Sequence, residues 1–288
     1  MKHQSDILAL KYRPKDFSDL IGQEYLVDTI RKSIQLNKIP NAYIFTGIRG
    51  VGKTTTARIV AKMLNCTAFD SSNQPDLLKC EQAKAITEDR HPDVIEIDAA
   101  SNTSVENARE IIENVKYNPV LGKYKVYIID EVHMLSNQAF NAFLKTLEEP
   151  PSYAIFILAT TEKYKVIPTI LSRCQIYDFN RIEIKDIVDQ LKKIAKEEDI
   201  SFEDDALHLI AQKSDGALRD ALSMFDLIVT FSSSKRITYQ NTITNLHILD
   251  HDYYFKLLDL FLEQDISATL MLFDEILKKG FDPHNFLI

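Results

Sequence analysis

A glycine-rich loop with the spacing that holds nucleotide phosphates lies near residue 50. The segment Gly47-Ile48-Arg49-Gly50-Val51-Gly52-Lys53-Thr54 fits the pattern G-x-x-x-x-G-K-[ST]. Its glycines let the backbone turn tightly and aim N–H groups at phosphate oxygens, Lys53 would reach the β and γ phosphates, and Thr54 would offer a hydroxyl to Mg²⁺. A glycine turn with an accidental lysine is the competing interpretation. An apolar run before the loop and helical spacing after it favour a nucleotide-binding loop.

Two neighbouring carboxylates end a second apolar run. Asp130 and Glu131 follow Val126-Tyr127-Ile128-Ile129, which has the composition of a buried strand. Asp130 would hold Mg²⁺ directly or through water, and Glu131 would act as general base on the attacking water. A solvated strand end is the alternative. With the phosphate loop, the two acids predict hydrolysis of a nucleoside triphosphate.

Further side chains could complete such a site. Thr160 and Thr161 follow the apolar run Ile155–Ala159, where a hydroxyl could bond the γ-phosphate or the attacking water, or could simply close a strand. Arg173 lies between a predicted helix and strand, where it suits either a finger supplied to a neighbouring subunit or a surface ion pair. Arg219, near the start of a later helix, is either a lid residue that reaches the γ-phosphate or a solvated helix residue.

Alternating strand and helix patterns surround these residues up to position 180. Such alternation predicts an α/β fold, a parallel sheet covered by helices. The segment from Cys66 to Asp93 is polar and fits neither pattern. The predicted strands are Ala42–Thr46, Val94–Asp98, Tyr124–Asp130, Ala154–Thr160 and Gln175–Phe179, with helices near 53–64, 104–116, 136–148 and 166–171.

After Asn180 the strand pattern stops and helical periodicity continues to the end. Asp282-Pro283 opens a further predicted helix just before the sequence stops, which indicates a fragment of a longer chain. The predicted helices are Ile184–Glu198, Asp204–Lys213, Gly216–Phe231, Tyr239–Leu246, Tyr253–Glu263 and Ile266–Lys279.

The overall composition is that of an ordinary globular protein. The chain has 288 residues, a net charge of −8 and only three cysteines, and its pI is about 5.4. The acidic balance argues against a surface coated with basic residues for nucleic acid, although a local basic patch remains open. With no long apolar run and no signal-like start, the sequence predicts a cytoplasmic protein that makes no membrane contact.

Taken together, these segments resemble the AAA+ clamp-loader ATPases over essentially the whole chain. The tripeptide Ser172-Arg173-Cys174, in register with the other motifs, is more specific than a phosphate loop. The matching segments are Lys11–Pro14, Ile21–Glu24, Gly47–Thr54, Glu96–Ser101, Asp130–Ser136, Lys145–Pro151, Leu158–Thr161, Ser172–Cys174 and Gly216–Leu222.

The resemblance implies an AAA+ P-loop NTPase with a parallel sheet, followed by helical parts. The ATPase domain would span 1–180, with an insertion at 66–93, a three-helix lid would span 181–243, and the start of a helical collar would span 244–288. By position, Thr161 resembles sensor 1, Arg219 sensor 2 and Arg173 a finger acting in trans. ATP and Mg²⁺ would be held by Tyr12, Arg13, Pro14, Gly47, Gly50, Val51, Gly52, Lys53, Thr54, Thr55 and Asp130.

The resemblance also implies partners. Five subunits would form an open spiral that contains delta, delta-prime and further copies of this type of chain. With ATP bound, the spiral would open the ring-shaped sliding clamp, and primer–template DNA would then trigger hydrolysis. Two forms of the full chain remain open: one that ends early, and one with a longer C-terminal tail that would contact the polymerase core and helicase.

One family feature is missing from this chain. The family usually carries a four-cysteine zinc module that ends in C-x-x-C-x-x-C, whose last three positions here are Leu77, Cys80 and Ala83. Only Cys66 and Cys80 remain, and two thiolates cannot complete a structural zinc site. We therefore expect no zinc, and we expect His91 to be a solvated histidine and not a third ligand.

Two other functional hypotheses remain. A non-hydrolysing structural subunit similar to delta-prime would also carry the Ser-Arg-Cys finger, but it would have no use for Lys53 and Thr54 together with Asp130 and Glu131. A small-molecule P-loop kinase would leave Arg173 and the helical second half unexplained.

Overall fold

The computed structural model describes residues 7–68, 75–101, 105–232, 235–246 and 251–278. Its contacts divide the chain into two compact units. The first contains Tyr12–Glu183 and Gly216–Leu218, and the second contains Met1–Lys11, Ile184–Asp215 and Arg219–Ile288. Each unit is described by itself.

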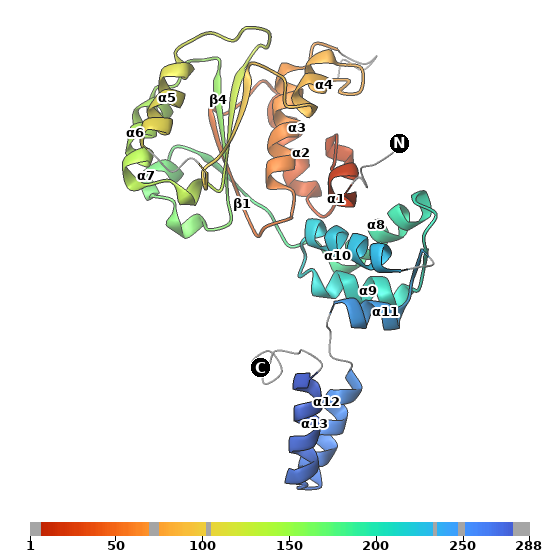
Figure 1. The fold of residues 1–288 in the computed structure, drawn as a ribbon. Coiled ribbons are helices and arrows are strands. Elements are labelled where there is room, and N and C mark those ends of the chain that lie inside the picture. Colours follow the sequence, from red (N-terminus) through yellow and green to blue (C-terminus); the bar gives the residue numbers. More distant parts are fainter. Residues whose placement is uncertain (1–6, 69–74, 102–104, 233–234, 247–250, 279–288) are drawn as a thin grey trace. The chain divides into compact units, whose positions relative to one another are not determined.

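A five-stranded parallel sheet forms the centre of the first unit, as predicted. Its order is β2-β3-β4-β1-β5, so that β4 lies between β3 and β1 (Figure 1). All side chains of β1 and β4 are buried, which explains why these strands read as continuous apolar runs. The strands are β1 (Ala42–Thr46), β2 (Val94–Asp98), β3 (Lys125–Asp130), β4 (Ala154–Thr160) and β5 (Gln175–Asp178).

Helices cover both faces of this sheet (Figure 1). Alternate residues of a strand point to opposite faces, so Tyr43 and Phe45 pack in one hydrophobic cluster while Ala42 and Ile44 pack in another. The first cluster lies under α2 (Glu24–Gln35), α3 (Lys53–Asn65) and α4 (Glu81–Thr87), and the second under α5 (Val105–Val115), α6 (Asn137–Glu148) and α7 (Pro168–Leu171).

Three single-turn 3₁₀ helices occur in the described part of the first unit. One precedes α2, and the other two directly follow the inner strands β3 and β4 at the same edge of the sheet. They are η1 (Phe17–Asp19), η2 (Val132–Met134) and η3 (Lys163–Lys165).

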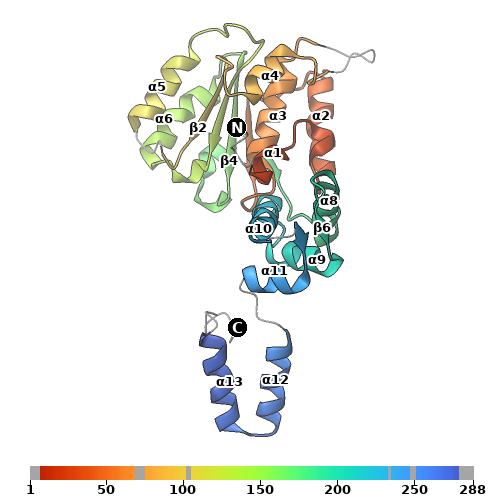
Figure 2. The ribbon, with the colours of Figure 1, turned by 45° about the vertical axis from the view of Figure 1, so that its right-hand side comes forward.

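The second unit is mainly helical. The short strands β6 (Ser201–Phe202) and β7 (Arg236–Ile237) pair in parallel. The last two helices, α12 (His251–Leu262) and α13 (Ile266–Lys278), lie side by side around the buried Ile276 (Figure 2). The other helices are α1 (Leu8–Lys11), α8 (Ile184–Glu197), α9 (Asp204–Lys213), α10 (Leu218–Phe231) and α11 (Tyr239–Asn245).

The structure corrects the expected secondary structure in a few places. Helix α4 lies in the segment that we expected to be irregular, because Ala83 and Ile86 give it one buried face. Helix α7 begins only at Pro168, since a residue before proline avoids the helical conformation. Helix α10 begins after Gly216, whose φ is +81°. The helix expected at Asp282-Pro283 lies outside the described residues.

Within the described ranges, no helix combines the length and the apolar character needed to cross a membrane.

Candidate active site

The phosphate loop connects the carboxyl end of β1 to the first residue of α3. Three of its glycines have positive φ, with 144° at Gly47, 83° at Gly50 and 102° at Gly52, a region that other residues rarely adopt. A Cβ atom at Gly47 would also lie 2.6 Å from the carbonyl oxygen of Phe179. The loop conformation therefore requires glycine at Gly47 for two independent reasons.

Lys53 is folded back onto this loop. Its Nζ atom donates to the carbonyl oxygens of Gly47, at 2.7 Å, and Ile48, at 2.8 Å, and the residue is only 6% exposed. Burial lowers the pKa of the Lys53 ammonium, while the carboxylates of Glu131 and Asp130 act in the opposite direction. Phosphate oxygens are stronger acceptors than these carbonyls, because they carry charge.

Thr54, in the first turn of α3, lies next to Asp130, the last residue of β3. The Thr54 hydroxyl donates to Asp130 Oδ2 at 2.6 Å, and Asp130 Oδ1 accepts the backbone N–H of Glu131 at 2.9 Å. Because β1, β3 and β4 run parallel, the segments that follow them meet at one edge of the sheet. The fold thereby joins the two sequence motifs into one cluster.

Glu131 has an unusual backbone. Its φ and ψ angles are 47° and 44°, in the left-handed region, which costs a residue other than glycine about 1–3 kcal/mol and which contacts with its surroundings must therefore stabilise. Its side chain is anchored by Thr161, whose hydroxyl donates to Glu131 Oε2 at 3.2 Å. The predicted base and the predicted sensor threonine are therefore direct neighbours.

The segment Tyr12-Arg13-Pro14 lies next to the start of α3. The Nε atom of Arg13 donates to the Thr55 hydroxyl at 3.2 Å, and all three residues of the segment are partly buried. Val51, in the loop itself, is 1% exposed. The structure thus brings together most of the residues that we expected to hold a nucleotide.

Arg173 lies at the amino ends of the parallel strands, whereas the phosphate loop lies at their carboxyl ends. It precedes β5, whose first residue, Gln175, pairs with Tyr43 of β1, and Gly47 follows Tyr43 by four residues. At about 3.3 Å per strand residue, this places Arg173 more than about 13 Å along the strand direction from the loop. Its side chain cannot cross that distance to phosphates bound by its own loop.

The Arg173 side chain instead bonds residues near it. It forms an ion pair with Glu148 at the end of α6, and its Nη1 atom donates to the carbonyl oxygen of Thr169 at 2.6 Å. A surface ion pair, one of the two roles considered above, is therefore present in the isolated chain. Arg219, the second residue of α10, belongs to the other compact unit.

Sequence reasoning missed a cluster beside Glu131. His133, whose side chain is 7% exposed, lies 3.4 Å from Glu131 Oε2 through Nδ1 and 3.3 Å from Glu162 Oε1 through Nε2. Its Nδ1 atom also shares a hydrogen bond of 3.0 Å with the Thr160 hydroxyl. The sequence feature that could have indicated this cluster is the position of His133 within the matching segment Asp130–Ser136. From the sequence, we assign His133 itself no role.

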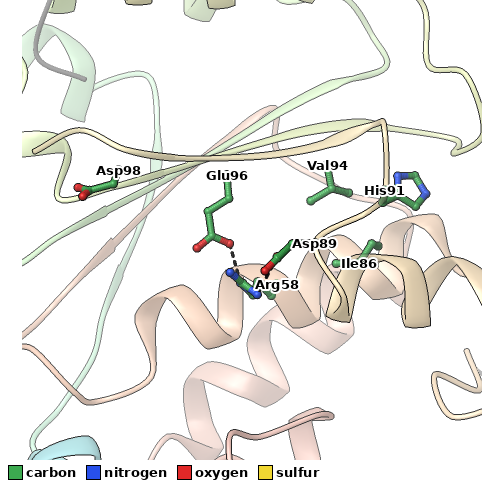
Figure 3. A pocket seen from close by; sticks show the side chains of 7 residues that line it. All are labelled: Arg58, Ile86, Asp89, His91, Val94, Glu96 and Asp98. Carbon is green, nitrogen blue, oxygen red and sulfur yellow. Dashed lines mark hydrogen bonds and ion pairs between the residues drawn. The ribbon is translucent and has the colours of Figure 1, made fainter. Parts of the chain in front are cut away.

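A polar pocket of about 360 Å³ lies at the β2 edge of the sheet (Figure 3). Within it, Arg58 pairs with Glu96 at 2.5 Å and with Asp89 at 2.9 Å. Burial disfavours the charge on Arg58, but the two carboxylates outweigh this effect and raise its pKa. The lining residues are Arg58, Ile86, Asp89, His91, Val94, Glu96 and Asp98, none of which belongs to the phosphate loop.

The positions of the family's zinc module do not suit zinc in this chain. Leu77 and Ala83 are 8% and 2% exposed and belong to the main hydrophobic cluster. The Cys66 thiol donates to the carbonyl oxygen of Ala68 at 3.0 Å. Two apolar side chains thus fill the places where thiolates would stand, and the described residues contain no metal-binding group of three or more.

His91 does not provide the missing ligand. We expected it to be solvated, and this was wrong, because it is 5% exposed. Its Nδ1 atom accepts the backbone N–H of Asp93 at 3.1 Å, so the neutral ring carries its proton on Nε2 and has no free lone pair there. Burial lowers its pKa, which keeps the ring neutral.

Metal analysis can test this assignment directly. We expect the purified chain to contain no stoichiometric zinc, and its melting temperature to stay unchanged with a chelator. The double variant Leu77→Cys with Ala83→Cys would restore four thiols, and we expect it to bind about one zinc per chain. Leu77→Ser with Ala83→Ser is the matched control that lacks thiolates. Stoichiometric zinc in the unaltered chain would overturn the assignment.

Two family models match this chain. The model described as "DNA polymerase III, delta subunit" matches residues 22–183. The model described as "DNA polymerase III clamp loader subunit, ATPase lid domain" matches residues 186–234. Between them, the two matches cover all five strands of the sheet and most of the helices up to α10.

Curated relatives extend the similarity to nearly the whole chain. It is 41% identical over 282 residues to the DNA polymerase III subunit tau of Escherichia coli, covering 98% of this chain and 43% of that protein. It is 43% identical over 272 residues to subunit tau of Bacillus subtilis, covering 94% of this chain and 48% of that protein. It is 43% identical to subunit gamma of Buchnera aphidicola subsp. Schizaphis graminum, covering 98% of this chain and 77% of that protein. The chain therefore spans about half the length of the tau relatives.

Solved structures show the same fold in a different protein. The Thermotoga maritima RuvB Holliday junction branch migration motor superposes with a TM-score of 0.61 and 20% identity, covering 88% of this chain and 80% of that one. At this identity the similarity extends only to the fold.

Proposed function

Because the chain belongs to the family of DNA polymerase III gamma and tau subunits, we propose that it hydrolyses ATP as a motor subunit of a clamp loader. The observation that carries the proposal is the cluster at the carboxyl edge of the sheet. There Lys53, the Thr54–Asp130 pair and the Glu131–Thr161 pair meet beside one glycine loop. A subunit with only a structural role would not need both halves of a hydrolytic site.

Each residue has a chemical role in this proposal. Lys53 releases the carbonyl oxygens of its own loop and binds the β and γ phosphates, which compensates the cost of its buried charge. Glu131 accepts a proton from the attacking water as general base. Thr161, which bonds the Glu131 carboxylate, holds that base in place and can exchange this bond for one to the γ-phosphate.

The residues present also fit Mg²⁺. Thr54 and Asp130 offer hydroxyl and carboxylate oxygens 2.6 Å apart, and oxygen is the ligand type that Mg²⁺ prefers. When bound, the ion neutralises phosphate charge. The Tyr12–Pro14 segment would contact the adenine and ribose, and the bond from Arg13 to Thr55 in the first turn of α3 supports this role.

Two arginines outside the phosphate loop are also part of the proposal. Arg173 acts in trans, on the nucleotide of a neighbouring subunit, and its position at the far edge of the sheet supports this role. Arg219 acts as sensor 2 on a lid that closes over bound ATP. We propose an ATPase domain at 1–180, a lid at 181–243 and the start of a collar at 244–288.

We propose that the chain works in the cytoplasm, within an assembly that contains delta, delta-prime and further gamma or tau copies. This assembly would open a sliding clamp and place it on primer–template DNA. The family membership and the lid match at 186–234 support these partners.

Steady-state ATP hydrolysis by the assembled complex tests the proposal. We expect hydrolysis to rise when primed DNA and clamp are both present, and Lys53→Ala to remove the activity of this subunit by weakening phosphate binding. Hydrolysis that does not respond to DNA and clamp would contradict the clamp-loader role. An activity unaffected by Lys53→Ala would instead favour a non-hydrolysing subunit similar to delta-prime.

A further inference from the structure

His133 connects two segments that both contribute to the candidate active site. It lies in η2, the 3₁₀ turn directly after Glu131, and its ring contacts the end of β4. On that side it reaches the Thr160 hydroxyl at 3.0 Å and the Glu162 carboxylate at 3.3 Å. Thr161, which bonds Glu131, lies between these two residues in the sequence.

The contacts on the β4 side are themselves well anchored. The backbone N–H of Glu162 donates to the Thr160 hydroxyl at 3.0 Å, so the threonine can use its own proton to bond His133 Nδ1. In that arrangement Nε2 carries the ring proton and donates to Glu162. Lys165 holds the Glu162 carboxylate at 2.8 Å, which keeps the acceptor in place.

The backbone of Glu131 needs such an anchor. The left-handed conformation of Glu131 costs free energy, so contacts that hold the turn in place stabilise it. Two residues further on, the His133 side chain is only 7% exposed, and its ring contacts Thr160 through Nδ1 and Glu162 through Nε2. The hydrogen bond from Thr161 to Glu131, at 3.2 Å, would weaken if the two segments moved apart.

From this geometry we infer that His133 is a positioning residue, which holds the Glu131 turn against the end of β4. Its hydrogen bonds fix the distance between the Glu131 carboxylate and the Thr161 hydroxyl. The inference rests on the proposed function, because it assigns Glu131 the role of general base. The His133 ring itself takes no part in the chemical step.

The test compares two substitutions of similar size. His133→Asn places an amide near the position of Nδ1, so it can keep the bond to Thr160. His133→Leu fills similar space without any hydrogen bond. We expect His133→Leu to lower the single-turnover hydrolysis rate roughly 10²-fold, the effect of a misplaced catalytic group. His133→Asn should stay within about fivefold of the unaltered rate, the effect of losing one hydrogen bond.

The Michaelis constant for ATP separates positioning from a general loss of structure. Among the described residues, Lys53 and Thr54 share no hydrogen bond or ion pair with His133, so this constant should stay unchanged in both variants. Equal rates for the unaltered chain and His133→Leu would overturn the inference. If the unaltered complex does not hydrolyse ATP, the proposed function fails first, and the inference then depends on the measurement below.

Hydrogen exchange tests the same inference without ATP. In η2 the N–H groups of Met134 and Leu135 donate to the carbonyl oxygens of Glu131 and Val132, at 2.9 Å and 3.1 Å. We expect a peptide covering residues 131–135 to exchange faster in His133→Leu than in His133→Asn. A peptide covering residues 206–213 of α9 is the control. Equal exchange of the first peptide in both variants would contradict an anchoring role.

Discussion

Replacing Arg173 with alanine is expected to lower ATP hydrolysis by the assembled complex about 10³–10⁵-fold, the contribution of arginine fingers in related phosphoryl-transfer systems. Arg173 lies at the amino end of β5, whereas the phosphate loop lies at the carboxyl end of the paired strand β1. Each chain should therefore still bind nucleotide normally. The measurement is hydrolysis together with nucleotide affinity, in the same complex.

Arg90→Ala is a suitable control for this variant. Arg90 is another exposed arginine paired with a carboxylate, that of Glu88. Exposed pairs contribute only about 0–1 kcal/mol to stability, so neither variant should unfold the chain. If Arg90→Ala and Arg173→Ala reduce hydrolysis equally, the effect is not specific to the finger.

Mixing experiments distinguish action in trans from action in cis. A chain with Lys53→Ala keeps a working Arg173, and a chain with Arg173→Ala keeps a working loop. Placed next to each other in one complex, they can form a complete site at their shared interface. We expect partial recovery of hydrolysis. Mixtures that stay as inactive as each variant alone would argue for a self-contained site.

Replacing Glu131 with glutamine is expected to lower the hydrolysis rate about 10²–10⁴-fold, the usual contribution of a general base. Glutamine has almost the same size and keeps an oxygen that can accept the Thr161 hydroxyl, but it cannot take a proton. In the proposed function, Lys53 would bind the phosphates without using the Glu131 carboxylate. We therefore expect bound ATP to persist, measured by single-turnover hydrolysis and by nucleotide affinity.

The control for this substitution is Glu113→Gln. Glu113 is an exposed carboxylate of α5, paired with Lys116 at 2.7 Å. The Glu113→Gln substitution removes one negative charge from the same unit without changing the candidate active site, so the hydrolysis rate should stay at the unaltered level. Retention of most of the activity by Glu131→Gln would mean that another group activates the water.

The parts of the fold and the site that could be predicted are those determined by short segments. The strands β1, β3 and β4 are buried on both faces, so each appears as an unbroken apolar run. The loop and the acids stand directly at the ends of such runs. Helix α4 was missed because it buries only one short face, formed by Ala83 and Ile86, within a polar segment.

The role of His133 illustrates what such segments cannot reveal. Its partners Thr160 and Glu162 lie 27 and 29 positions further along the chain and become neighbours only because β4 pairs with β3. Similarly, the burial of His91 depends on packing around the insertion, which local composition did not indicate.

The sequence by itself determined that the chain has a phosphate loop, two acids at a strand end and a parallel α/β fold, because local spacing and apolar periodicity specify these features. Only the tertiary structure decided which residues share a site. Strand order placed Thr54, Asp130, Glu131 and Thr161 together at one edge, and strand direction placed Arg173 at the other. The physical reason is that parallel strands collect their carboxyl ends at a single edge, a property of the whole sheet and of no single segment.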